Sequence, residues 1–115
     1  MNLGTYNLNH HVQQSEHLHA VRREDLRIGD VVYVRTCNSL YSIRVDEQRF
    51  FKVSGGWFDQ DGGNPVKTTI AGCTWGGSVI NVDVVAAVGL SIEFGNRVTT
   101  SPIQKIIFIP RERRN

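Results

Sequence analysis

Apolar and polar residues alternate in several short runs of this chain, with a period of two, and segments with the period of a helix are nearly absent. In residues 40–45, for example, Tyr41, Ile43 and Val45 fall on one face and polar residues lie between them. Such alternation is typical of β-strands that bury one face. Further strands are predicted at residues 31–36, 49–54, 66–74, 78–83, 90–94, 97–100 and 103–109. Residues 84–88 are apolar on all sides and are interpreted as a strand or a connector.

Turn residues separate these runs at intervals of roughly ten residues, and glycine pairs stand at 55–56 and 76–77. Seven or eight short strands are therefore expected in an all-β fold, as a small antiparallel β-barrel or a sandwich. The stretch Leu26-Arg27-Ile28-Gly29-Asp30-Val31 resembles the opening of many small β-barrels, SH3-like ones among them, in which a short turn leads into the first strand. The resemblance implies a fold and no function.

A chain of 115 residues is expected to form one domain. Residues 1–23 are rich in Asn, Gln and His and are interpreted as a flexible polar arm, followed by a single all-β domain over 24–109 and a basic tail over 110–115. No apolar run approaches the ~20 residues of a membrane helix, and no secretory signal is visible, so a cytoplasmic location and no membrane partner are expected. Cys37 and Cys73 are then expected to be reduced, unless the fold brings them together.

The net charge of +2 is unevenly distributed along the chain. Between Glu24 and Ile109 there are eight basic and nine acidic residues, which leaves the predicted domain at −1 and places the positive excess at the two ends. Protein surfaces that follow a phosphate backbone usually concentrate Lys and Arg. This balance counts against a nucleic-acid partner.

The sequence offers little for catalysis, because all four histidines lie in the predicted arm and leave no base for Ser78 or Cys73. Asp59 and Asp61 remain as a carboxylate pair for a small enzyme, although loop aspartates more often shape turns. No catalytic residue is predicted.

Neither a metal nor a cofactor is predicted. Residues 59–64 alternate oxygen ligands as a calcium loop does, but Ile70 stands where a bidentate Glu is needed. His17 and His19 have no thiol or carboxylate to complete a metal set. Neither glycine pair is followed by the Lys-Ser/Thr of a phosphate-binding loop.

Large aromatic side chains beside the glycine turns are the strongest candidate for a binding surface. Trp57, Phe58 and Trp75 are predicted to line one ligand-binding groove, with Tyr33 or Tyr41 at its rim. The alternative is that the indole rings close the ends of a barrel and belong to its core.

The predicted function is a non-enzymatic binding or assembly module that contacts a protein segment or a small ligand through this Gly/Trp-rich loop surface. One alternative is a nucleic-acid-binding β-barrel that combines aromatic stacking with the basic tails. Another alternative is a small enzyme that uses the loop aspartates. Homo-oligomerisation through an edge strand, with residues 103–109 as the candidate, is compatible with each of them.

Overall fold

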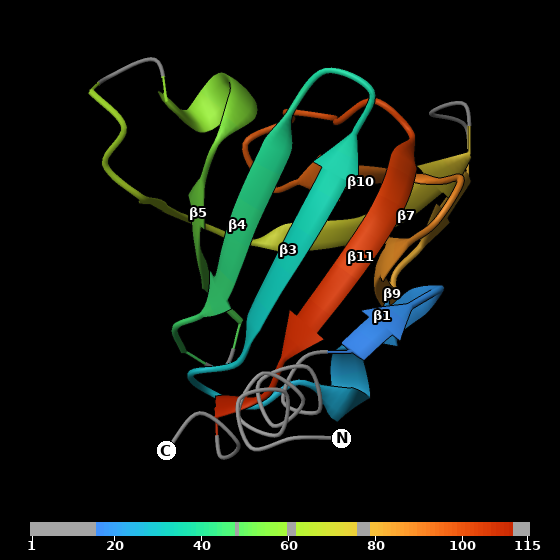
Figure 1. The fold of residues 1–115 in the computed structure, drawn as a ribbon, viewed down its shortest axis with the longest axis horizontal. Helices are drawn as coiled ribbons and strands as arrows, with labels where there is room; N and C mark the ends of the chain where they lie inside the picture. Colours follow the sequence, from blue (N-terminus) through green and yellow to red (C-terminus); the bar gives the residue numbers. More distant parts are fainter. Residues whose placement is uncertain (1–15, 48, 60–61, 76–78, 112–115) are drawn as a thin grey trace, which may run out of the picture.

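A six-stranded antiparallel sheet forms the largest part of the fold in the computed structural model, which describes residues 16–47, 49–59, 62–75 and 79–111 (Figure 1). Its strand order is β1-β11-β3-β4-β5-β6. The strands are β1 (Glu16–Leu18), β11 (Ile103–Ile109), β3 (Val31–Thr36), β4 (Leu40–Val45), β5 (Phe51–Ser54) and β6 (Val66–Thr68). Strands β3 to β6 follow one another as a meander, because each connection is a turn or loop that reverses the chain.

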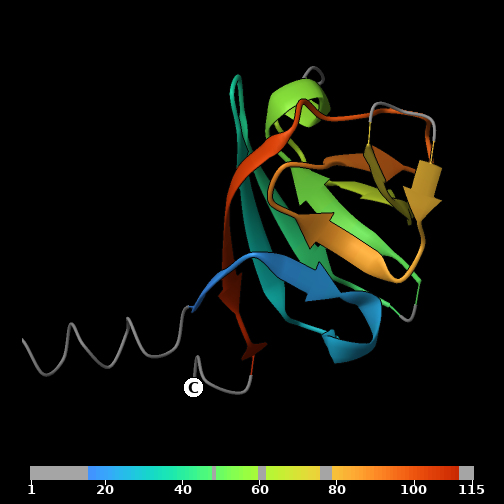
Figure 2. The same cartoon turned by 90° about the vertical axis from the view of Figure 1, so that its right-hand side faces the viewer.

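Two smaller sheets cover one face of the six-stranded sheet (Figure 2). The first has the order β10-β7-β8 and the second pairs β2 with β9. These strands are β2 (Ala20–Arg22), β7 (Ile70–Trp75), β8 (Val79–Asn81), β9 (Val84–Ala87) and β10 (Ser91–Phe94). Two 3-10 turns, η1 (Arg23–Asp25) and η2 (Gly56–Asp59), complete the described elements. The prediction of an all-β fold is confirmed, while the finer choice between a barrel and a sandwich stays a prediction.

The hydrophobic core lies between the large sheet and the two smaller ones. Strand alternation turns every second side chain of the six-stranded sheet inward, and the smaller sheets contribute the opposite wall. The side chains that are almost completely buried include Val32, Val34, Ile43, Val53 and Ile106 from the large sheet, and Ile70, Cys73, Val85, Ile92 and Phe94 from the smaller ones. The other face of the large sheet carries the remaining side chains, which are cationic and polar residues together with apolar ones such as Tyr33, Leu40 and Ile107.

Residues 16–22 form β1 and β2 and so belong to the sheets rather than to the predicted arm. Strand β1 pairs with β11, and β2 pairs with β9. Val21 is buried in the hydrophobic core, and the partly buried side chain of Leu18 packs against this core. Strands of three residues are too short for a period of two to be visible, and their partners lie far away in the sequence. Residues 1–15, which include the rest of that arm, lie outside the described residues.

Strand β11 is an interior strand, because β1 and β3 pair with its two sides. The prediction that residues 103–109 form an edge strand is therefore wrong. Strand β1, which pairs with the second side of β11, was not predicted from the sequence. Residues 97–100, a further predicted strand, contribute only an isolated bridge between Glu93 and Thr99. In the described part of the chain, no helix has the length and apolarity needed to cross a membrane.

The buried carboxylate of Asp30 ties the start of β3 to the end of β11. One of its oxygens accepts a hydrogen bond from the backbone N–H of Arg27, and the other accepts one from Arg111, both at 2.8 Å. Gly29, with φ +93°, allows the turn that leads into β3. This anchor helps to hold β3 and β11 side by side, and both strands contribute to the cavity described below.

Candidate functional site

Of the three aromatic residues predicted to form one groove, Trp57 and Phe58 lie together in η2, whereas Trp75 lies at the end of β7. Trp57 is 47% exposed in η2, and Trp75 is 79% exposed at the end of β7. Figure 1 shows η2 beside β4 and β5 at the left of the view, whereas the yellow strand β7 passes behind the large sheet and ends at the right, beyond β11. Tyr41, proposed for the rim, is buried. The two indole rings are thus exposed in different places, and ligand binding by either of them stays a prediction.

Phe58 lies in the core at 2% exposure, where it forms the centre of an aromatic cluster. Its ring centroid is 4.8 Å from that of Phe94, 5.3 Å from that of Trp57 and 6.3 Å from that of Tyr41. Nearly perpendicular ring planes at these distances are a favourable aromatic arrangement. Phe58 therefore closes one end of the core, as the alternative interpretation expected of the indole rings.

The loop carboxylate within the described residues has a structural role. The Oδ1 atom of Asp59 accepts a hydrogen bond of 2.8 Å from the backbone N–H of Gly55, which holds the turn after β5. Asp61 and Ser78, the other candidates for catalysis, lie outside the described residues. Among the residues that are described, no three His, Cys, Asp or Glu side chains gather as a metal site would require.

The two cysteines are free thiols in very different surroundings. Cys37 is exposed in the turn between β3 and β4, while Cys73 is buried in β7. Burial raises the pKa of the Cys73 thiol to about 11, because desolvation disfavours the thiolate. Cys73 therefore remains protonated at neutral pH and has the character of a core residue rather than of a nucleophile.

A thiol reagent should modify Cys37 and spare Cys73 in the native protein at pH 8. A pKa raised from 9.0 to about 11 lowers the thiolate fraction of Cys73 about 100-fold, and burial blocks access as well. The measurement is the number of thiols that react with a chromogenic disulfide, with Cys37→Ser as the control. That variant should show no rapid reaction until it is unfolded in urea; rapid native reaction would mean that β7 opens readily.

The face of the six-stranded sheet that points away from the two smaller sheets collects positive charge. Strands β3, β4, β5, β6 and β11 contain no acidic residue, and each contains one basic residue whose side chain is exposed. These residues are Arg35, Arg44, Lys52, Lys67 and Lys105. Directly paired residues of neighbouring strands point to the same side of a sheet, and the register places all five on the outer face. We call this surface the basic face.

The register also sets like charges directly opposite one another. Lys105 pairs with Arg35 across β11 and β3. Lys52 pairs with Arg44 on one side and with Lys67 on the other. Like charges in directly opposed positions destabilise a sheet. The basic face therefore carries two positive rows whose members repel each other.

Lys67 is the basic residue of this face that has acidic neighbours in the described structure. Its Nζ atom lies 2.9 Å from Glu47 and 3.6 Å from Asp46, and the hydrogen bond to Glu47 is the main cause of the raised pKa of Lys67. Among the residues that the structure describes, the other four cations of the basic face form no ion pair. Most of the positive charge on this face is thus available to a partner.

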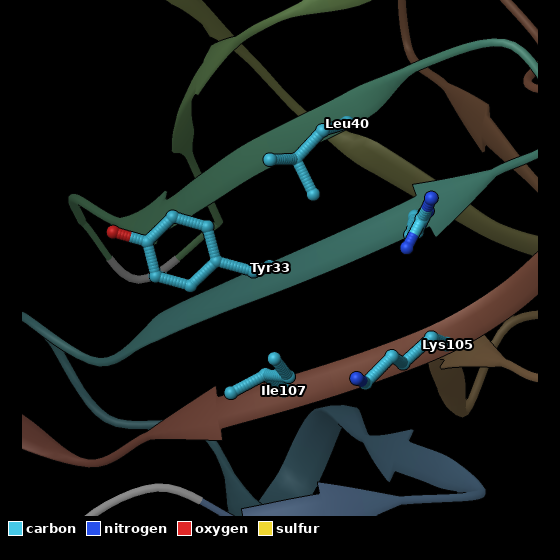
Figure 3. Close-up of a pocket in the computed structure, with 5 residues that line it drawn as sticks. Tyr33, Leu40, Lys105 and Ile107 are labelled. Carbon is cyan, nitrogen blue, oxygen red and sulfur yellow. The ribbon is translucent and has the colours of Figure 1, made fainter. Parts of the chain in front are cut away.

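A cavity of about 340 Å³ lies on the basic face beside the row formed by Lys105 and Arg35. It is lined by Tyr33, Arg35, Leu40, Lys105 and Ile107, and Figure 3 shows the side chains of Tyr33, Leu40, Lys105 and Ile107 on one side of strands β3, β4 and β11. Tyr33 is half-buried, and Leu40 is 58% exposed. The site therefore offers one aromatic ring and two aliphatic side chains directly beside two cations.

The two positive rows lie on opposite sides of Tyr33. Arg35 belongs to the first row, and Val31, four positions earlier on β3, pairs with Arg44 of the second. A strand rises ~3.3 Å per residue, so the rows are roughly 13 Å apart. A ligand that contacts both rows must be extended and must carry more than one negative charge.

Sequence reasoning missed the basic face because the charges were summed along the chain rather than over a surface. Most of the described acidic residues that balance these cations lie in turns and 3-10 elements, Asp46, Asp59 and Asp83 among them, while Glu93 lies in β10 of a smaller sheet. The alternation in 40–45 does indicate that Arg44 points outward, and the same holds for the other strands. The pairing of distant strands, however, is invisible in the sequence.

In comparisons of this chain with protein-family models, with curated proteins and with solved structures, no match was found.

Proposed function

We propose that this protein is a non-enzymatic binding module that holds an extended anionic partner on the basic face. The observation that carries the proposal is the direct opposition of like charges, Lys105 against Arg35 and Lys52 against Arg44 and Lys67. Each row costs the free protein stability through repulsion. An anionic group placed across a row replaces that repulsion with charge-assisted hydrogen bonds.

The separation of the rows favours a polymer over a small ion. A single phosphate or carboxylate reaches one row, whereas the second row lies roughly 13 Å away along β3. A polyanion contacts both rows at once, so the second contact is intramolecular and gains from a high effective concentration. The positive field of the face also accelerates the encounter with such a partner. This role requires no catalytic group, in line with the expectation that the protein is not an enzyme.

A second candidate function retains the predicted aromatic contact. Trp75 is 79% exposed at the end of β7. Tryptophan is among the residue types that are enriched in protein-binding surfaces. A protein segment that docks here would leave the basic face open, so the two functions do not exclude each other. A cytoplasmic location stays a prediction.

The test of the proposed function uses inorganic polyphosphate as a polyanion without apolar groups. The double variant Arg35→Gln/Lys105→Gln removes the first row and should weaken polyphosphate binding about tenfold, since each charged hydrogen bond contributes ~1.5 kcal/mol before screening reduces it. The slope of log K against log salt should become shallower by about 1.4. Affinity is measured by calorimetric titration of the full-length protein at several salt concentrations.

The matched control removes the same number of charges away from the basic face. Arg22 pairs with Glu24 at 3.3 Å beside η1, and Arg97 lies in the turn after β10. The double variant Arg22→Gln/Arg97→Gln should change the affinity less than twofold. Equal weakening in both double variants would show that net charge alone attracts the polyanion, and this would overturn the proposal. Thermal melts of both variants verify folding, and the variant without the first row should be at least as stable as the native protein because a repulsion is lost.

A further inference from the structure

We infer that the extended anionic partner is a single-stranded nucleic acid with one base stacked on the ring of Tyr33. This inference rests on the proposed function, because it assigns a chemical class to the ligand of the basic face. The observation behind it is that an aromatic side chain, Tyr33, lies between the two positive rows. A polyanion such as polyphosphate needs only the cations, whereas a nucleic acid also presents flat apolar bases between its phosphates.

Tyr33 stands in the middle of the basic face in a position suited to stacking. It lies on β3, flanked by Ile107 on β11 and Ser42 on β4. Neither neighbour is charged, and the cavity beside the ring is lined by Leu40 and Ile107 (Figure 3). Aromatic rings on an open sheet surface are platforms on which unpaired bases stack, largely without regard to sequence.

The rows on either side of Tyr33 are placed to receive the phosphates that flank a stacked base. The first row, Lys105 and Arg35, also lines the cavity, so a phosphate next to the base meets cations there. The second row receives a phosphate further along the strand, roughly 13 Å away. The ligand path therefore runs from the first row along β3 across Tyr33, and then to Arg44 on the neighbouring strand β4, which pairs with Val31.

Single-stranded ligands fit this face better than duplexes or acidic polypeptides. In a duplex the base faces are covered by stacking, and base edges are read by an element that enters a groove. The basic face consists of side chains on a sheet, and the described residues contain no helix beyond two short 3-10 turns. An acidic polypeptide satisfies the cations but has no flat group at every unit to occupy the cavity at Tyr33.

The experiment measures the fluorescence anisotropy of a labelled ten-nucleotide oligo(dT) and of a matched oligo(U) with the full-length protein. Tyr33→Leu should weaken oligonucleotide binding about tenfold, because stacking contributes ~1–3 kcal/mol per base. Tyr33→Phe keeps the ring and should stay within twofold of the native protein. Neither variant should alter the affinity for polyphosphate. The two oligonucleotides distinguish DNA from RNA as the source of the stacked base.

Each competing ligand has a defined outcome. Equal loss of affinity in Tyr33→Leu and Tyr33→Phe, or no loss in either, would overturn the stacking inference and leave the proposed function intact if polyphosphate still binds. Competition by a duplex or by poly-glutamate as strong as that by unlabelled oligo(dT) would also overturn it. If none of these polyanions binds, the proposed function fails together with the inference. Thermal melts verify that Tyr33→Leu folds, which is expected because its side chain lies outside the core.

Discussion

Phe58→Ala is expected to lower the free energy of unfolding by about 3–5 kcal/mol, as is usual for the loss of a buried phenyl ring. The side chain is 2% exposed, and its ring lies against those of Phe94 and Tyr41. Its removal leaves a cavity at one end of the core that neighbouring aromatic rings, packed edge to face, cannot fill without changing rotamer. Urea denaturation followed by tryptophan fluorescence measures the change.

The adjacent aromatic residue provides the control for this prediction. Trp57 is 47% exposed, and its ring lies edge to face against the ring of Phe58. Trp57→Ala should cost about 1 kcal/mol, the scale of one aromatic pair. Because this variant lacks one of the two tryptophans, far-ultraviolet circular dichroism follows its unfolding. A loss as large as that of Phe58→Ala would place both rings in the core and would contradict the separation of these two neighbours into surface and interior.

Gly55→Ala is expected to destabilise the protein by about 2–4 kcal/mol, the sum of a left-handed conformation and a steric overlap. Gly55 has φ +96°, and an added Cβ atom would overlap the backbone carbonyl oxygen of Leu40. A backbone atom cannot move aside as a flexible side chain does, so the first residue of β4 must shift. Because Leu40 lines the cavity on the basic face, the variant also tests whether this end of β4 is rigid. Urea denaturation measures the change in the free energy of unfolding.

Gly89→Ala is the matched control because it shares the conformation without the overlap. Its φ is +90°, and no heavy atom lies within 4 Å of the position of the added Cβ. Only the conformational cost of about 1–2 kcal/mol should remain. The difference between the two variants therefore isolates the contact with Leu40, and identical losses would indicate that the β4 end yields easily.

Strands with a clear local signal were predictable from sequence to within a few residues. Residues 31–36, 40–45 and 103–109 form strands with those bounds. The first is a β-branched run, the second alternates between apolar and polar residues, and the third is an apolar run between two prolines. Strands β1 and β2 were not predictable, since three residues give no measurable period. Their strand conformation depends on backbone hydrogen bonds to β11 and β9, which are far along the chain.

The candidate site was predictable only in part, because adjacent aromatic residues can have opposite environments. Trp57 and Phe58 both follow the same glycine pair, and composition does not indicate which ring turns inward. The 3-10 turn η2 decides this by directing Phe58 at Phe94. The total charge was equally uninformative, because acidic residues in turns cancel cations that point away from them.

Local chemistry alone determined that this chain is all-β, that alternate side chains of its strands face outward and that turns occur at its glycines. These properties depend on neighbouring residues and on the period-two geometry of an extended backbone. The tertiary structure decided which distant strands lie side by side. Lys105 and Arg35 become a like-charged pair, with Tyr33 beside them, only because β11 returns to pair with β3. Such long-range pairing depends on how the whole core packs, which the local pattern of the sequence does not specify.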